Sequence, residues 1–135
     1  MFNEENKLIQ RMVPMLQRVL IVDPAPASAR LLADLMRNIS AGHLWNAPSN
    51  RRGLEAADQV NPQLIFVELS GANVDGVDFA RRVRRSEMNC RQAPIVMVTA
   101  TATAAAILGA RDAGAHEFLR KPHTAKDLLP RLEAV

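Results

Sequence analysis

Four polar residues of complementary chemistry stand at or beside the ends of separate apolar segments of the chain. They comprise two carboxylic acids, a hydroxyl and an ammonium group: Asp23, Glu68, Thr99 and Lys121. Groups of these types form charge-assisted hydrogen bonds when they meet, and carboxylates also bind Mg²⁺. Because the four are far apart in sequence, the surrounding elements decide whether they form a site.

The apolar segments near these residues are typical of β-strands. Three are short apolar runs with β-branched residues, at Arg18–Val22, Gln63–Leu69 and Pro94–Thr99. A weaker segment at His43–Ala47 and a short one at Glu117–Leu119 complete five expected strands. The longer apolar runs predict strands buried on both faces, as in parallel sheets. The carboxyl ends of parallel strands lie at one edge of the sheet, so the four polar residues are expected to meet there.

Helical patterns separate the expected strands. They cover Ser28–Ile39, Asn50–Val60, Val77–Ser86, Thr103–Ala113 and Thr124–Ala134. Gly114 is a suitable residue to end the fourth helix, and Thr124 is a suitable N-cap for the fifth. Five strands alternating with five helices, joined by right-handed crossovers, predict a doubly wound α/β sheet with helices on both faces.

Residues 1–17 precede this pattern and are expected to form an extension to a domain at residues 18–135. Leu8, Ile9, Met12 and Val13 make a short helical stripe before Pro14. Two interpretations remain open: a frayed or loosely docked leader, and a helix that packs on the domain or on a partner. The second predicts that truncation changes the oligomeric state, with a homodimer as one such assembly.

Length and composition indicate a single soluble domain. The chain has 135 residues, of which 48% are hydrophobic and 23% are charged. A single cysteine excludes a disulfide framework and a cysteine-rich zinc site, and no apolar run approaches the ~20 residues that span a bilayer. We therefore expect a cytoplasmic protein without a membrane segment. A net charge of +3 and an aromatic content of 4% do not predict direct DNA binding.

Four motifs resemble the receiver domains of two-component response regulators. They are LIVD (Leu20–Asp23), ELSGANVDG (Glu68–Gly76) where the family has D-L-x-x-P-x-x-D-G, PIVMVTA (Pro94–Ala100) and GAHEFLRKP (Gly114–Pro122). The Lys-Pro pair after the fifth strand is the most specific piece. The resemblance covers residues 18–135. It implies a flavodoxin-like (βα)₅ fold with strand order 2-1-3-4-5 and a role in bacterial two-component signal transduction or a phosphorelay.

The resemblance also implies roles for the four polar residues. In the family, two acids after the first strand and an aspartate after the third bind Mg²⁺, and that aspartate accepts a phosphoryl group. A hydroxyl after the fourth strand and a lysine after the fifth contact the phosphoryl oxygens. By position, Asp23 matches one acid of the pair and Glu68 the acceptor, while Thr99 matches the hydroxyl and Lys121 the cation.

Three departures from the family pattern change the expected chemistry. Pro24 stands where the second acid is expected, Glu68 replaces the acceptor aspartate, and Ala72 replaces a proline of the following loop. Pro24 removes an oxygen ligand for Mg²⁺. The extra methylene of Glu68 moves its carboxylate by ~1.5 Å, and misplacements of ~1 Å can slow a transfer ~10²-fold. We therefore expect neither a cofactor nor efficient phosphotransfer, with Asp23 and Glu68 as weak metal candidates.

These departures favour a receiver that binds a protein partner without being phosphorylated. Asp23, Glu68 and Lys121 leave a formal charge of −1, and Glu68 is expected to reach toward Lys121 and Thr99 and so hold the domain near the activated arrangement. The partner would be a sensor kinase, a phosphotransfer protein or a downstream effector. Two alternatives remain open for the site: a decayed site kept for packing, and a weakly phosphorylatable receiver.

The family resemblance also indicates a face for binding partners. In the family, the fourth helix, fifth strand and fifth helix form this face, where a threonine and an aromatic residue change rotamer together. Thr99 and Phe118 match these two positions. Phe118 is equally consistent with an ordinary core aromatic. No output domain is expected after Val135, so a contact of the receiver fold itself would transmit the signal.

A run of arginines supports another alternative, recognition of an anionic ligand such as cyclic di-GMP. Its members are Arg81, Arg82, Arg84, Arg85 and Arg91. Guanidinium groups bind phosphate bidentately and stack on purines. A solvated helix face, opposite Phe79 and Val83, explains the run equally well. No motif of a dehydrogenase, hydrolase or zinc enzyme accompanies it, so we do not expect an enzyme.

Overall fold

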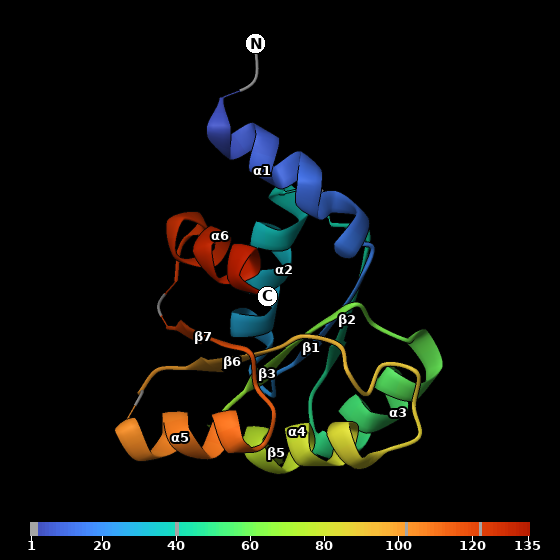
Figure 1. Ribbon diagram of the computed structural model, residues 1–135. Coiled ribbons are helices and arrows are strands. Elements are labelled where there is room, and N and C mark those ends of the chain that lie inside the picture. Colours follow the sequence, from blue (N-terminus) through green and yellow to red (C-terminus); the bar gives the residue numbers. More distant parts are fainter. Residues whose placement is uncertain (1–2, 40, 102, 122) are drawn as a thin grey trace.

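Five parallel strands form the central sheet, in the spatial order β2-β1-β3-β6-β7 (Figure 1). Their bounds are Arg18–Val22 (β1), His43–Ala47 (β2), Leu64–Glu68 (β3), Ile95–Thr99 (β6) and Glu117–Arg120 (β7). The computed structural model describes residues 3–39, 41–101, 103–121 and 123–135. Counted along the chain, the five strands follow the order 2-1-3-4-5. The predicted doubly wound sheet is therefore confirmed.

Helices cover both faces of this sheet (Figure 1). On one face lie α2 (Pro26–Asn38) and α6 (Ala125–Ala134). On the other face lie α3 (Asn50–Val60), α4 (Gly76–Arg85) and α5 (Ala104–Asp112). The central strands β1, β3 and β6 are therefore covered on both sides, which explains their continuous apolar runs in the sequence.

Alternating side chains of each strand supply the two halves of the core. Val19 and Ile21 of β1 belong to the cluster under α2 and α6. Leu20 and Val22 belong to the cluster under α3, α4 and α5. Successive side chains of a strand point to opposite faces, so a single apolar run fills both layers.

The predicted ends of most elements differ from the observed ends by one or two residues. A short hairpin was not predicted: β4 (Ser70–Gly71) pairs antiparallel with β5 (Val74–Asp75). Asn73 forms its turn with a φ of 60°, a left-handed conformation that asparagine tolerates better than most residues. The hairpin lies immediately after Glu68, so it bears on the candidate site.

The N-terminal extension contains α1 (Glu4–Met12) and a short 3-10 helix, η1 (Val13–Met15). Met12 and Leu16 are buried, and they join the same core cluster as Leu132 of α6. The described part of the extension therefore packs on the domain, as in the interpretation of a docked helix, and not as a frayed leader. Residues 1–2 and Pro122 of the Lys-Pro motif lie outside the described residues. Among the described helices, none combines the length and apolarity needed to span a membrane.

Candidate functional site

The ends of four neighbouring strands, β1, β3, β6 and β7, bring the predicted polar residues to one edge of the sheet. Val22 of β1 is level with Val67 of β3, so Asp23 and Glu68 occupy corresponding positions at the strand ends. Glu68 is in turn level with Val98 of β6, the residue before Thr99. Lys121 directly follows β7, the strand beyond β6. The parallel register thus gathers residues that are distant in sequence.

Lys121 joins the two carboxylates of this edge. Its Nζ lies 2.6 Å from Oε2 of Glu68 and 3.2 Å from Oδ2 of Asp23. Oδ1 of Asp23 accepts a hydrogen bond of 2.8 Å from the Ala25 amide. Asp23 and Glu68 are only 5% and 9% exposed. The contact to Glu68 is a close ion pair without the alignment of a hydrogen bond, and within the described residues Oε2 has no aligned donor.

Burial and pairing act in opposite directions on these charges. Burial raises the pKa of Glu68 above its ordinary value, and the lowering effect of Lys121 does not fully offset it. Burial lowers the pKa of Lys121, but the nearby Glu68 and Asp23 carboxylates outweigh it, so this pKa is raised. Lys121 therefore stays charged, and it is the group that compensates the buried carboxylates.

The hydroxyl of Thr99 does not take part in this ion-pair cluster. Its Oγ1 donates to the carbonyl of Thr101 at 2.7 Å and accepts from the Thr101 amide at 3.1 Å. Because its one proton is used within its own loop, the expected contact with Glu68 is not formed. Glu68 thus reaches Lys121 as predicted, but no hydrogen bond joins it to Thr99 within the described residues.

Pro24 packs against the hairpin that follows Glu68. A Cβ built on Gly71 would lie 3.0 Å from Cγ of Pro24 and 3.4 Å from Cγ of Glu68. The hairpin backbone therefore passes close to both residues, and a larger residue than glycine would require Pro24 to shift slightly. The proline that replaces an expected acid has a packing role here.

Asn50, at the start of α3, fixes the hairpin and was not identified from the sequence. Its Oδ1 accepts from the Asp75 amide at 3.0 Å, and its Nδ2 donates to the Asp75 carbonyl at 3.1 Å and to Oδ2 of Asp78 at 3.3 Å. Its backbone amide donates to the Asn73 carbonyl at 3.0 Å. Only the fold brings these segments together, so sequence spacing gave no signal for this contact.

The donor set at this edge does not fit Mg²⁺. Asp23 and Glu68 are the two acids that the strand ends contribute, and both already contact Lys121. Across the described parts of the chain, no three His, Cys, Asp or Glu side chains are grouped so that they could hold a metal ion. Mg²⁺ requires near-octahedral oxygen ligands, and Pro24 supplies no side-chain oxygen.

The five arginines of the run have separate roles in the structure. Arg84 is partly buried and donates to the carbonyls of Gly114, Arg91 and Ala93 at 2.7–3.2 Å. The prediction of one solvated face is therefore wrong for Arg84, which ties α4 to two loops. Gly114, at φ +103°, has room only for hydrogen where Arg84 passes.

The other members of the run lie nearer the surface. Arg82 pairs with Asp78 at 2.9 Å, and Arg91 donates to the Met88 carbonyl at 3.4 Å. Arg81 and Arg85 are exposed, one helical turn apart, and no carboxylate of the described residues lies within ion-pair distance of either. Of the five arginines, Arg81 and Arg85 thus have exposed guanidinium groups without a carboxylate partner among the described residues.

The face of α5, β7 and α6 contains the predicted switch pair. Thr99 is buried and Phe118 is partly buried against the core layer under α3, α4 and α5. Leu108 of α5 is 61% exposed, the largest exposure among the large apolar residues that the structure describes as exposed. This face thus has an exposed leucine on α5 and a partly buried aromatic on β7.

His123 is a buried residue next to the ion-pair cluster. It is 5% exposed, and neither ring nitrogen has a hydrogen-bond partner among the described residues. Burial lowers the pKa of His123, and the positive charge of Lys121 lowers it further, while Asp127 and Asp23 act in the opposite direction. The folded state therefore favours the neutral ring.

Replacing His123 by leucine should weaken the dependence of stability on pH in mild acid. As the pH falls below the ordinary value of 6.5, the unfolded chain takes up a proton at His123 before the folded chain does, so stability is lost. His123→Leu removes this contribution. Urea unfolding at about pH 7.5 and about pH 5.5 measures the difference.

His116→Gln is the matched control for this experiment. Burial and Arg84 also lower the pKa of His116, so this variant removes a separate part of the pH dependence and leaves that of His123. An unchanged loss of stability in His123→Leu would show that the buried ring does not resist protonation.

Comparisons with known proteins identify the family. The response regulator receiver domain profile matches residues 19–133. The chain is 31% identical over 117 residues to the transcriptional regulatory protein PdtaR of Mycobacterium tuberculosis, covering 87% of this chain and 55% of PdtaR. It is 27% identical over 118 residues to a probable chemotaxis protein CheY of Rhizobium etli, covering 87% of this chain and 91% of that protein.

Solved structures agree with the fold. Chemotaxis protein CheY4 of Vibrio cholerae superposes with a TM-score of 0.81 at 21% identity, covering 89% of this chain and 99% of that chain. The chain spans only about half the length of some curated relatives, such as PdtaR at 55%. Sequence and structure together show that this chain belongs to the response regulator receiver domain family of two-component signalling.

Proposed function

We propose that this receiver domain signals by binding a protein partner and does not require phosphorylation. The supporting observation is the ion pair of 2.6 Å between Lys121 and Glu68. In this family, the lysine contacts the phosphoryl group, whereas here the ammonium group of Lys121 already contacts the carboxylate of Glu68. The permanent negative charge of Glu68 replaces a transient one.

The site chemistry also disfavours phosphoryl transfer. Two carboxylates and one ammonium leave a formal charge of −1, so a divalent cation is less strongly attracted than by three carboxylates. Pro24, which lies against the hairpin, provides no metal ligand. The hydroxyl of Thr99 donates to the Thr101 carbonyl. Glu68 therefore does not mimic the contact between this hydroxyl and a phosphoryl group. We therefore propose that the fixed charge of Glu68, paired with Lys121, holds the domain in one signalling state.

The proposed binding face is formed by α5, β7 and α6, with Leu108 and Phe118 as its apolar part. A sensor kinase, a phosphotransfer protein or a downstream effector would bind there, in the cytoplasm, and we do not propose an enzymatic activity. The face lies beside Lys121, so a change in the ion-pair cluster can alter it.

Incubation with acetyl phosphate and Mg²⁺ should leave the protein unmodified at Glu68. Intact-protein mass spectrometry measures any added phosphate, and Glu68→Gln is the control for labelling elsewhere. Affinity capture with a cognate kinase, phosphotransfer protein or effector then compares the wild type with Glu68→Gln and Glu68→Asp. Stoichiometric phosphate on the wild type, absent from Glu68→Gln, would refute the proposal in favour of a weakly phosphorylatable receiver.

The capture experiment also separates a fixed signalling state from a decayed site. Loss of binding in Glu68→Gln would show that the partner requires the carboxylate. Equal binding by all three chains would show that the cluster is kept only for packing, as the alternative interpretation holds.

The anionic-ligand alternative is supported by Arg81 and Arg85, which are exposed and free of carboxylate partners in the described residues. Guanidinium groups one turn apart can hold a phosphate. Carboxylates near them weaken this alternative, since Asp78 already pairs with Arg82. A titration with cyclic di-GMP that gives no heat would remove it.

A further inference from the structure

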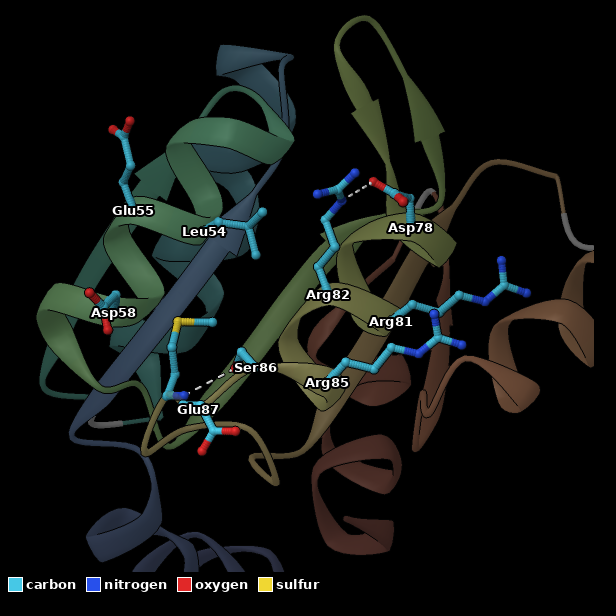
Figure 2. Close-up of a pocket in the computed structure, with 10 residues that line it drawn as sticks. Leu54, Glu55, Asp58, Asp78, Arg81, Arg82, Arg85, Ser86 and Glu87 are labelled. Atoms are coloured by element: carbon cyan, nitrogen blue, oxygen red, sulfur yellow. Dashed lines mark hydrogen bonds and ion pairs between the residues drawn. The ribbon is translucent and has the colours of Figure 1, made fainter.

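A groove between α3 and α4 lies outside the proposed binding face (Figure 2). Its volume is about 950 Å³. The two helices are in close contact in their first turns, where a Cβ on Gly53 would lie 2.8 Å from the ring of Phe79. The groove is lined mainly by the later turns of both helices and by the loop after α4.

Acids line the α3 side of this groove, and arginines predominate on the α4 side, where Asp78 is paired with Arg82. Glu55 and Asp58 belong to α3. Glu87 belongs to the loop after α4, and Figure 2 shows it on the side of α4 that is nearer to α3. Arg81 and Arg85 project from the far side of α4. We call these two sets the acidic wall and the basic wall.

Apolar side chains lie between the walls. Leu54 of α3 and Met88 of the loop after α4 also line the groove, and both are partly buried. An apolar centre with charged residues around it has the composition of a protein-binding surface. The chemistry is therefore that of a protein contact.

The charged side chains of the two walls do not pair with each other across the groove in the described residues. No ion pair within 4.0 Å joins α3 to α4 in the described residues. Glu55 pairs with Arg51 and Arg52 of its own helix, and Arg82 pairs with Asp78 of its own helix. This leaves two acids, Asp58 and Glu87, and two bases, Arg81 and Arg85, to interact with another molecule.

We propose that a second copy of this chain binds along the groove, with the acidic wall of each copy facing the basic wall of the other. A two-fold axis parallel to the groove exchanges its two sides and brings opposite charges together. An axis across the groove would place like charges together, so electrostatics selects the first arrangement. Every favourable charge contact then occurs twice.

The other ligands that the arginines could serve fit the groove less well. A nucleotide or a nucleic-acid backbone would meet Arg81 and Arg85 but also the carboxylates of Asp58 and Glu87. A second copy satisfies both signs with one surface. The assembly would leave the face of α5, β7 and α6 free, so it is independent of the proposed function.

The expected dimer is weak and sensitive to salt. α3 and α4 have 11 and 10 residues, so each is about 15 Å long. Two such helices bury less than the ~800 Å² per partner of a standard interface. Charges at the surface are screened within about 10 Å at 0.1 M salt. We therefore expect reversible association at high protein concentration and low salt.

Exchanging the charges of one wall tests this geometry. Sedimentation equilibrium of the full chain should show self-association for the wild type at low salt. Arg81→Glu/Arg85→Glu and Asp58→Arg/Glu87→Arg should each weaken it at least ~10-fold, because like charges then face each other. An equimolar mixture of the two variants should associate with each other, since opposite walls again meet.

Arg30→Glu/Arg37→Glu, on the exposed side of α2, is the control for Arg81→Glu/Arg85→Glu, because both variants replace two arginines by glutamates. It should associate like the wild type. The mixing step also shows that both groove variants are folded. A wild type that stays monomeric at low salt would overturn the proposal and leave the groove to a different protein. Groove variants that associate like the wild type, or a mixture that does not associate, would overturn it as well.

Discussion

Lys121→Met should lower the free energy of unfolding by about 3 kcal/mol, the usual cost of removing one partner from a buried ion pair. The substitution leaves Asp23 and Glu68, which are 5% and 9% exposed, without their shared cation. Lys121 itself is only partly exposed, so solvent screens the lost attraction little. Urea unfolding at about pH 7.5 measures the change.

The decrease in the free energy of unfolding caused by Lys121→Met should become smaller in acid. The ammonium group lowers the pKa of Glu68, so its removal raises that pKa further above the unfolded value. A raised carboxyl pKa stabilises the folded state below the unfolded pKa, and this stabilisation is lost as the pH rises through the folded pKa. The variant should therefore approach the wild type as the pH falls toward the ordinary value of 4.5.

Two further variants isolate the ion pair from other effects of the substitution. Lys126→Met, on the exposed side of α6, should change stability by less than about 0.5 kcal/mol. Lys121→Met/Glu68→Gln should be more stable than Lys121→Met alone, because a neutral amide replaces a buried unpaired charge. Equal destabilisation by Lys121→Met and Lys126→Met would show that the cluster contributes nothing to folding.

The fold was predictable from the sequence because parallel strands buried on both faces have a simple pattern. The run from Val19 to Val22 is continuously apolar because both core layers take side chains from it. The element ends were less predictable. Pro26 begins α2 two residues before the expected start, and the hairpin of β4 and β5 has no apolar period because Ser70 and Gly71 are exposed.

Convergence of the candidate site was predictable, but its hydrogen bonds were not. The position of each residue at a strand end follows from topology, and the pairing of Glu68 with Lys121 follows from charge. The bonds from Thr99 to Thr101 depend on the conformation of one loop. The contacts of Asn50 depend on how α3 meets the hairpin. Neither leaves a periodic signal in the sequence.

Arg84 shows why residue type alone misassigned part of the arginine run. Five arginines close together suggested a single anion-binding surface, but α4 turns Arg84 toward the loops around Gly114 and Ala93. A guanidinium group has five donors, which suits it to several carbonyls at once. The same chemistry that recognises phosphate is here used to hold two loops together.

Adding one carboxylate after β1 and shortening the acid at the end of β3 should convert the protein into a phosphate acceptor. Pro24→Asp/Glu68→Asp supplies the second acid of the family pattern and shortens the acceptor side chain. With Asp23, three carboxylates then face Lys121, so Mg²⁺ has more oxygen ligands. The acceptor carboxylate oxygen would attack the phosphorus of acetyl phosphate, forming an acyl phosphate and releasing acetate.

Each single substitution should be much less effective than the pair. Glu68→Asp corrects the position of the acceptor but leaves Pro24 against Gly71, and Pro24→Asp supplies a ligand but leaves the acceptor ~1.5 Å too long. We expect phosphorylation at least ~10²-fold slower in either single variant than in the double variant. Mass spectrometry over time with Mg²⁺, and with EDTA as the control, measures these rates. If Glu68→Asp alone matched the double variant, Pro24 would be irrelevant to the metal, and the length of the acceptor side chain alone would control phosphorylation.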